Sequence, residues 1–246
     1  MNLKIIGTGS KGNAYILGNK DEALLIECGV NIKDIKIALN FDLSKVVGCI
    51  VTHEHQDHCK SINEVMSAGI NVYTGAKTLT ALQPSNKHRS NVIAAMQTIR
   101  LGNFRIRAFD VQHDAAEPLG FLIEHPDCGR VLFLTDTYYC KYAFPGLNNI
   151  IIEANYSKEI VDRKFGSDSG KEFLRNRILR SHFSLANCKE MLAANDLSKV
   201  NNIVLIHLSD SNSDEIQFQK EIAELTGKTV TVASNGMNIQ FGKTPF

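Results

Sequence analysis

The sequence predicts an α/β fold in one domain over residues 1–246, with mixed rather than purely parallel sheets. Short runs of apolar and β-branched residues alternate with segments of helical spacing along the whole chain. The middle of the chain is rich in strands, which favours mixed sheets over a purely parallel one. No short repeat and no low-complexity linker divides the chain.

Apolar runs bounded by turn-forming or charged residues predict the strands. In chain order, they cover residues 3–6, 14–17, 23–26, 49–51, 71–73, 104–111, 119–124, 130–134, 149–152, 202–206, 229–232 and 238–241. Apolar residues three and four positions apart predict the helices. In chain order, these cover residues 32–39, a segment around 62–66, 78–82, two or three helices between 157 and 195, and 214–225. Ser213 and Asp214 are candidate caps of the last helix, and a Pro-Ser-Asn sequence predicts an exposed loop over residues 83–91.

The composition limits the class of protein. Hydrophobic residues make up 43% of the chain, enough for a sizeable core, and the formal net charge is +1. Dedicated binders of long nucleic acid are usually strongly basic, so this charge weakens, without excluding, a polynucleotide substrate. No apolar stretch approaches the roughly 20 residues of a membrane span. The six cysteines form no C-x-x-C pair, and with no apparent signal peptide they predict reduced thiols in a cytoplasmic protein.

The strongest functional signal is the hexapeptide HEHQDH at residues 53–58. Its imidazoles and carboxylates are costly to place together unless their charges and lone pairs are used. Imidazole and carboxylate ligands together suit zinc, and also manganese or iron. The hexapeptide follows the apolar run 49–51, and ligands gather at the carboxyl ends of strands in open α/β folds. Glu54 and Gln56 do not belong to the pattern and are expected to point elsewhere.

Three further side chains of metal-ligand type follow predicted strands. They are His113, Asp136 and His207. Taken alone, a histidine at a strand end is more often an ordinary hydrogen-bonding residue, and Asp136 could belong to a turn or a helix cap. Because the hexapeptide stands upstream, we predict that all three are metal ligands.

These residues resemble the metallo-β-lactamase superfamily, which has the signature H-x-H-x-D-H and later ligands in the same order. The resemblance covers nearly the whole chain and implies the αβ/βα sandwich, in which two mixed β-sheets pack together with helices on the outer faces. It also implies two divalent metal ions, zinc or manganese. One ion would be held by His53, His55 and His113; the second would be held by Asp57, His58 and His207, with Asp136 as the bridge between them.

A pair of metal ions about 3.5–4 Å apart lowers the pKa of a shared water, so that no side-chain nucleophile is required. We expect Asp57 and His182 to act directly in catalysis. The segment around His182 is similar to the extra histidine motif of the phosphodiesterase branches of the superfamily, which include transfer-RNA 3′-processing nucleases. There this histidine contacts the phosphate or protonates the leaving oxygen. The alternative is that Ser181 or Ser184 caps a helix and His182 merely lies nearby.

Further segments narrow the resemblance. The sequence GSKGN at residues 9–13 and LSDSN after His207 resemble WalJ/YycJ-like proteins. TDTY at residues 135–138 and IEANY at 152–156 add a similarity to the anti-Pycsar phosphodiesterases, which degrade cyclic CMP and cyclic UMP. This resemblance implies hydrolysis of small cyclic nucleotides and, by analogy, a homodimer. The alternative is a WalJ/YycJ-like DNA exonuclease, which a basic groove leading to the metals would favour. Thiolester or lactam hydrolysis and a non-catalytic metal-binding role fit the sequence less well.

Two features depart from simple patterns. Many members of the superfamily have aspartate after the third strand, where this chain has Glu27; it either orients a metal-binding histidine or simply ends the strand. The spacing G-x-G-x-x-G at residues 7–12 formally matches a dinucleotide-binding fingerprint. That fingerprint must open a helix, whereas residues 14–18 predict a strand, so we reject a dehydrogenase.

Overall fold

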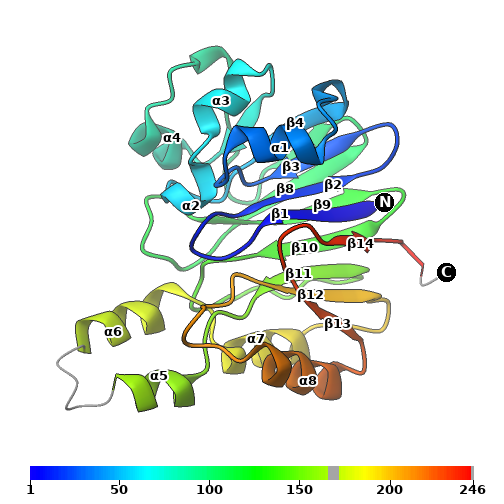
Figure 1. Ribbon diagram of the computed structural model, residues 1–246. Helices are drawn as coiled ribbons and strands as arrows, with labels where there is room; N and C mark the ends of the chain where they lie inside the picture. The colour runs from blue at the N-terminus through cyan, green and yellow to red at the C-terminus, as the bar shows by residue number, and fades with distance from the viewer. Residues whose placement is uncertain (166–171, 245–246) are drawn as a thin grey trace.

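The computed structural model describes residues 1–165 and 172–244, and two seven-stranded sheets pack face to face in it (Figure 1). The first sheet has the order β14-β1-β2-β3-β4-β5-β6. Its strands are β1 Asn2–Gly7, β2 Ala14–Gly18, β3 Ala23–Ile26, β4 Val46–Ile50, β5 Val72–Thr74, β6 Ser90–Val92 and β14 Asn238–Gln240. Strands β3 to β6 run parallel, whereas β1 pairs antiparallel with β2 and β14. This hairpin agrees with the predicted strand at residues 14–18.

The second sheet has the order β13-β12-β11-β10-β9-β8-β7. Its strands are β7 Thr98–Leu101, β8 Phe104–Asp110, β9 Leu119–His125, β10 Gly129–Leu134, β11 Asn149–Glu153, β12 Asn202–Ile206 and β13 Thr229–Val232. Strands β10 to β13 are parallel, and β7 to β10 are antiparallel. Both sheets are therefore mixed, as the sequence predicts.

Helices cover the outer faces of both sheets. They are α1 Ile32–Ala38, α2 Gln56–Cys59, α3 Ile62–Ser67, α4 Ala76–Leu82, α5 Lys158–Lys164, α6 Glu172–Ser181, α7 Leu185–Ala193 and α8 Glu215–Thr226. In Figure 1, α1 and α3 lie beyond the first sheet and α7 and α8 beyond the second. Asp214 caps α8 as predicted, because its side chain accepts a hydrogen bond of 3.0 Å from the backbone N–H of Gln217. Among the described residues, no helix is long and apolar enough to cross a membrane.

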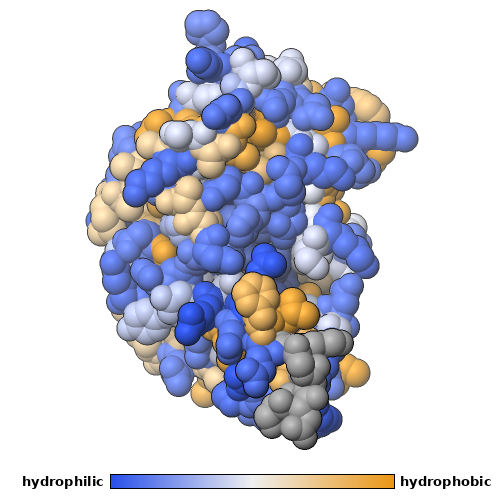
Figure 2. Space-filling model, turned by 90° about the vertical axis from the view of Figure 1, so that its left-hand side faces the viewer, coloured by the Kyte–Doolittle hydropathy of each residue, from blue (hydrophilic) through white to orange (hydrophobic). Residues whose placement is uncertain are grey.

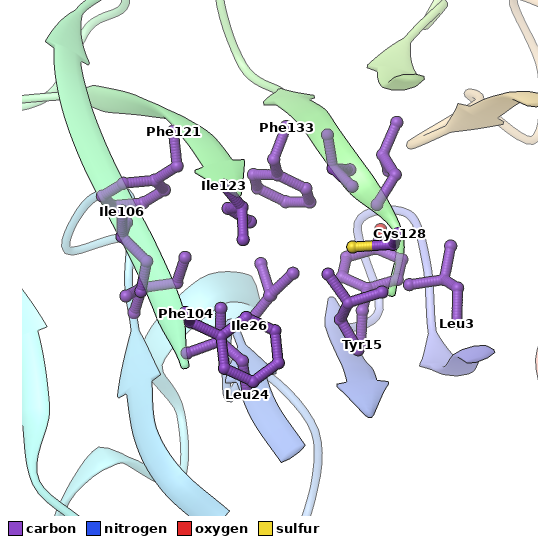
Figure 3. Close-up of a cluster of buried hydrophobic side chains, with 14 of the residues drawn as sticks. Leu3, Tyr15, Leu24, Ile26, Phe104, Ile106, Phe121, Ile123, Cys128 and Phe133 are labelled. Atoms are coloured by element: carbon purple, nitrogen blue, oxygen red, sulfur yellow. The ribbon is translucent and has the colours of Figure 1, made fainter. Parts of the chain in front are cut away.

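The main core lies between the two sheets (Figure 3). Side chains alternate across each strand, so Leu24 and Ile26 of β3 enter this core while Leu25 packs under α1 and α3. Phe121 and Phe133 do the same from β9 and β10, and both are fully buried. A phenylalanine buried this deeply contributes about 3–5 kcal/mol relative to alanine. The rigid sandwich fixes the strand ends from which the functional side chains project.

Several short elements differ from the sequence prediction. Strand β7 and helix α2 were not expected, and residues 83–91 are not wholly a loop, because a 3₁₀ turn at Lys87–Arg89 leads into β6. Strand β6 has only three residues and no apolar alternation, so its parallel pairing with β5 decides its conformation. Strand β4 begins at Val46, earlier than the predicted position 49.

Candidate metal centre

All eight predicted site residues converge at one edge of the sandwich. The hexapeptide follows β4, while the later side chains follow β8, β10, α6 and β12. These segments lie far apart in the sequence, but the strands that lead to them end at the same edge. Figure 2 views the molecule from this side and shows mostly hydrophilic side chains around the middle of the face.

One half of the centre consists of three imidazoles. The Nδ1 atom of His55 lies 3.0 Å from Nε2 of His53 and 3.1 Å from Nε2 of His113. Two nitrogens bound at 2.0–2.1 Å to a tetrahedral zinc ion are about 3.3 Å apart, which is close to this spacing. Three ring nitrogens directed at one point thus fit a divalent cation far better than a hydrogen-bond network.

The other half combines a carboxylate with two imidazoles. Oδ2 of Asp57 lies 3.4 Å from Nε2 of His58 and 3.3 Å from Nε2 of His207. Asp136 reaches into this half, with Oδ2 at 3.0 Å from His58 and Oδ1 at 3.9 Å from His207. Asp136 also groups with His53 and His58, so its carboxylate lies between the two halves. The donor set of each half suits a divalent metal ion.

Contacts outside the centre fix the orientation of the imidazole rings. His113 donates from Nδ1 to the carbonyl oxygen of Ser181 at 2.7 Å, which leaves the lone pair of Nε2 facing the centre. Nδ1 of His53 is hydrogen-bonded to the hydroxyl of Thr52 at 2.9 Å. Nδ1 of His58 lies 3.5 Å from Oε1 of Glu27, so this contact is electrostatic rather than a good hydrogen bond. Glu27 therefore faces a histidine of the centre.

Charges within the centre shift the pKa values in opposite directions in the two halves. Burial opposes a charge on His58 and His207, but the carboxylate of Asp136 beside them raises the pKa of His58 well above its usual range and that of His207 to about 9. Burial dominates in the three-imidazole half and lowers the pKa of His53 and His113. Burial also opposes ionisation of Asp136, but the two cationic rings hold its pKa well below the usual range.

His182 points into the centre, and a capping residue lies beside it. Its Nδ1 atom lies 2.7 Å from Oε1 of Glu153 and 3.2 Å from Oδ1 of Asp136. Burial lowers the pKa of His182, but these two carboxylates outweigh it and raise the value to about 10. Ser184 caps α7 by accepting from the N–H of Asn187, so the helix is capped without His182.

Glu153 is a candidate site residue that we did not predict. It is fully buried at the end of β11 and accepts hydrogen bonds from the backbone N–H groups of Thr137 and Phe183, at 3.3 and 3.1 Å. Its position at the end of an apolar strand was one available signal, because Asp136 and His207 also follow strands, and the IEANY segment at residues 152–156 was another. These contacts hold its carboxylate against His182.

Small and amide residues support the loop that carries Asp57. The side-chain amide of Asn13, within the GSKGN sequence, donates to the backbone oxygen of Asp57 at 3.2 Å. A Cβ atom on Gly29 would lie 1.7 Å from that same oxygen, so only glycine allows this approach. Glu54 turns away from the centre, as predicted, and accepts from the N–H of Ala116 at 2.7 Å.

The beta-lactamase superfamily domain matches residues 23–208 of the chain. The chain belongs to the metallo-β-lactamase superfamily. It is 27% identical to exodeoxyribonuclease YycJ of Bacillus anthracis over 233 residues, or 88% of this chain and 86% of YycJ. It is 29% identical to exodeoxyribonuclease WalJ of Streptococcus pneumoniae over 238 residues, or 90% of this chain and 85% of WalJ. The fold is similar to that of YhfI from Bacillus subtilis, with a TM-score of 0.70 and 16% identity over 97% of this chain and 99% of YhfI.

Membership of this superfamily confirms the predicted αβ/βα sandwich, and with it the prediction of an enzyme. The chain is a metal-dependent hydrolase. The His and Asp cluster at the edge of the sandwich is suited to divalent metal ions.

Proposed function

We propose that this chain is a phosphodiesterase that removes nucleotides from DNA ends, the function that we weighed as the alternative on sequence. The observation that carries the proposal is the pairing of His182 with Glu153 beside two adjoining ligand sets. Such a histidine serves phosphoester cleavage, where an alkoxide leaving group needs a proton. The similarity to two exodeoxyribonucleases over most of the chain supports DNA as the substrate.

The proposed ligands divide into two sets. His53, His55 and His113 would hold one divalent ion, and Asp57, His58 and His207 a second, with Asp136 shared. When bound, a pair of such ions polarises the scissile phosphate and provides hydroxide at neutral pH. Zinc and manganese both suit the donor set.

The chain's own residues orient the substrate and supply a proton. Glu153 holds Nδ1 of His182, and the Nε2 atom has no hydrogen-bond partner among residues 1–165 and 172–244. The side chain is 24% exposed, so this nitrogen is accessible to a phosphate or a leaving oxygen. Because the two neighbouring carboxylates raise its pKa, His182 is protonated at neutral pH and can donate. A cation on Asp136 would offset part of that shift, and Glu153 would then be the main support.

The cyclic-nucleotide specificity, the homodimer and the cytoplasmic location remain predictions. The relatives favour DNA over a cyclic nucleotide, since both are named exodeoxyribonucleases. A net charge of +1 is compatible with an enzyme that binds only a short stretch at a DNA end.

One comparison of substrates tests the proposal. Purified protein with Mn²⁺ or Zn²⁺ is incubated with end-labelled single-stranded and duplex DNA, cyclic CMP and cyclic UMP. We expect stepwise release of nucleotides from DNA and little turnover of the cyclic nucleotides. Asp136→Asn should abolish the activity, whereas Asp196→Asn, the same change at an exposed position just after the C-terminal end of α7, should leave it intact. Turnover of cyclic nucleotides alone would refute DNA as the substrate.

A further inference from the structure

A groove lies on the outer face of the second sheet, where no described helix covers β7, β8 and β9. It is formed by these strands and by the segment 142–145, and its volume is about 320 Å³. We call it the β8 groove. A volume of this size is within the range of binding sites for organic ligands.

The β8 groove is positively charged. Arg105, Arg107 and Arg130 line it together with one acidic residue, Glu124. Glu124 is occupied by two of the arginines, at 3.1 Å from Arg105 and 2.7 Å from Arg130. Arg107 is exposed and has no hydrogen-bond or ion-pair partner in the described part of the chain. A ligand with an anionic group would therefore complement the charge of the groove.

Aromatic side chains form the floor and one wall. The ring of Phe109 lies directly on Gly120, where a Cβ atom would come within 2.4 Å of it. Phe144 and Tyr142 pack against this ring, with centroids 4.8 and 5.6 Å from it. Tyr142 is half-buried, and its hydroxyl donates to Asp110, which also forms an ion pair of 2.7 Å with Lys141. Phe109 and Phe144 are buried, so Tyr142 is the ring of this wall that a base can reach, and Arg107 is a nearby cation without a partner among the described residues. An accessible ring beside a cation matches a base and a phosphate of a single nucleic-acid strand.

Both sides of the β8 groove are formed by segments that lead along the chain to residues of the metal centre. Phe109 is four residues before His113, so their Cα atoms are at most about 14 Å apart, and Arg107 is at most about 22 Å away. The wall formed by residues 142–145 belongs to the segment that starts at Asp136. A backbone hydrogen bond of 3.0 Å from Tyr138 to Gln112 ties these two segments together at the rim of the centre.

We propose that the β8 groove binds the part of a single DNA strand that lies beyond the nucleotide at the metal centre. Phosphates of the strand contact Arg107, and a base stacks on the aromatic wall at Tyr142. The inference rests on the proposed function. A basic groove near the metals is the feature that, in the sequence analysis, favours a DNA exonuclease over a cyclic-nucleotide enzyme.

The test compares a dinucleotide with a strand of about twelve nucleotides, because only the longer one reaches the groove. Arg107→Ala should raise the KM for the longer strand roughly 10-fold, with a smaller change for the dinucleotide. The slope of log KM against log salt should fall by about 0.7, the value for one lost phosphate contact on a single strand. Thr98→Glu, which places a carboxylate opposite Arg107 on β7, should have the same effect through an exposed residue. Lys33→Ala removes one positive charge at an exposed position of α1, over the other sheet, and is the matched control. It should change neither the KM for the longer strand nor the salt dependence.

A second readout separates this inference from the proposed function. Fluorescence anisotropy of the labelled longer strand is measured with EDTA present, so that binding is seen without cleavage. Absence of DNA cleavage by the wild type would refute the proposed function, while weaker binding by Arg107→Ala would still support the groove. Cleavage with equal KM values for wild type and Arg107→Ala on the longer strand would refute the groove alone. Two other results would also refute the groove assignment. If Arg107→Ala weakened inhibition by a mononucleotide but not binding of the longer strand, Arg107 would belong to the metal centre. If it changed the elution volume in size-exclusion chromatography, the result would indicate a role in assembly.

Discussion

Loading the metal-free protein with divalent ions should release about two protons, both from the half of the centre that contains Asp57. Although burial of both rings opposes the shift, the carboxylate of Asp136 raises the pKa of His58 well above its usual range and that of His207 to about 9. Both rings are therefore cationic at pH 7 in the metal-free protein. A histidine that binds a metal must be neutral, so each loses a proton when the ion binds.

The three-imidazole half should behave differently. Burial lowers the pKa of His53 and His113, so these two rings are already neutral at pH 7 and have no proton to release. The contrast follows from the carboxylates, because Asp136 and Asp57 lie against the rings of His58 and His207. In the metal-free protein, the protons on His58 and His207 supply the positive charge that the second cation would supply when bound.

The magnitude follows from proton linkage. Each released proton makes the apparent binding constant change about 10-fold per pH unit, so binding of the second ion should strengthen about 100-fold per unit near pH 7. The sign is fixed by the raised pKa values: acid favours the protonated, metal-free rings. Above about pH 9 His207 is already neutral, and the dependence should weaken. Binding of the first ion should change much less with pH in this range.

Isothermal titration calorimetry with Zn²⁺ or Mn²⁺ measures this release. The titration is repeated at pH 7 in buffers of different ionisation enthalpy, and the slope of the observed heat gives the number of protons. His207→Gln should lower that number by about one, whereas His88→Gln, in the exposed 3₁₀ turn, should not change it. Equal proton release in both binding steps, or none in either, would show that this account of the charges is wrong.

Three further predictions concern single side chains. His182→Asn should lower kcat on DNA about 10²- to 10⁴-fold without unfolding the protein, as measured by steady-state kinetics and circular dichroism. Gly29→Ala should destabilise the fold by about 1–3 kcal/mol in thermal denaturation and weaken metal binding, because its Cβ would meet the backbone of Asp57. Burial opposes ionisation of Glu22, but hydrogen bonds from Asn103 and His125 outweigh it and lower its pKa. The ionised Glu22 should therefore stabilise the fold above about pH 4.5, and this contribution should be lost in more acidic solution. Glu22→Gln should make the free energy of unfolding depend less on pH in the acidic range.

The positions of the candidate ligands could be predicted because they depend on strand ends. Strand β4 of the first sheet and strands β10 and β12 of the second all end at the same edge of the sandwich. The polar residues that follow them therefore lie close together, independently of the conformation of the intervening loops. Imidazoles are also rare enough that a cluster stands out: the chain has eight histidines, and three lie within residues 53–58. Both arguments need only local pattern and chain order.

Glu153 was missed because its role is defined by distant neighbours. A glutamate after an apolar strand is an ordinary strand end, and the resemblance carried by residues 152–156 assigned no role to it. Its function becomes apparent only when His182 and His207, from other segments, are seen against its carboxylate. Strand β7 was missed for a related reason: its four residues become a strand by pairing with β8.

Backbone conformation shows what the centre costs the fold. Glu27, Asp136 and His207 each follow a strand with positive φ, at 61°, 45° and 55°. L-residues in this left-handed region cost of order 1–3 kcal/mol each, and glycine would avoid that strain. Glycine has no side chain to contact a histidine or to bind a cation. The strain at these positions is therefore accepted for the sake of the side chain. The same turn that strains each residue also directs its carboxylate or imidazole back across the end of the strand, toward the centre, instead of onward into the following loop.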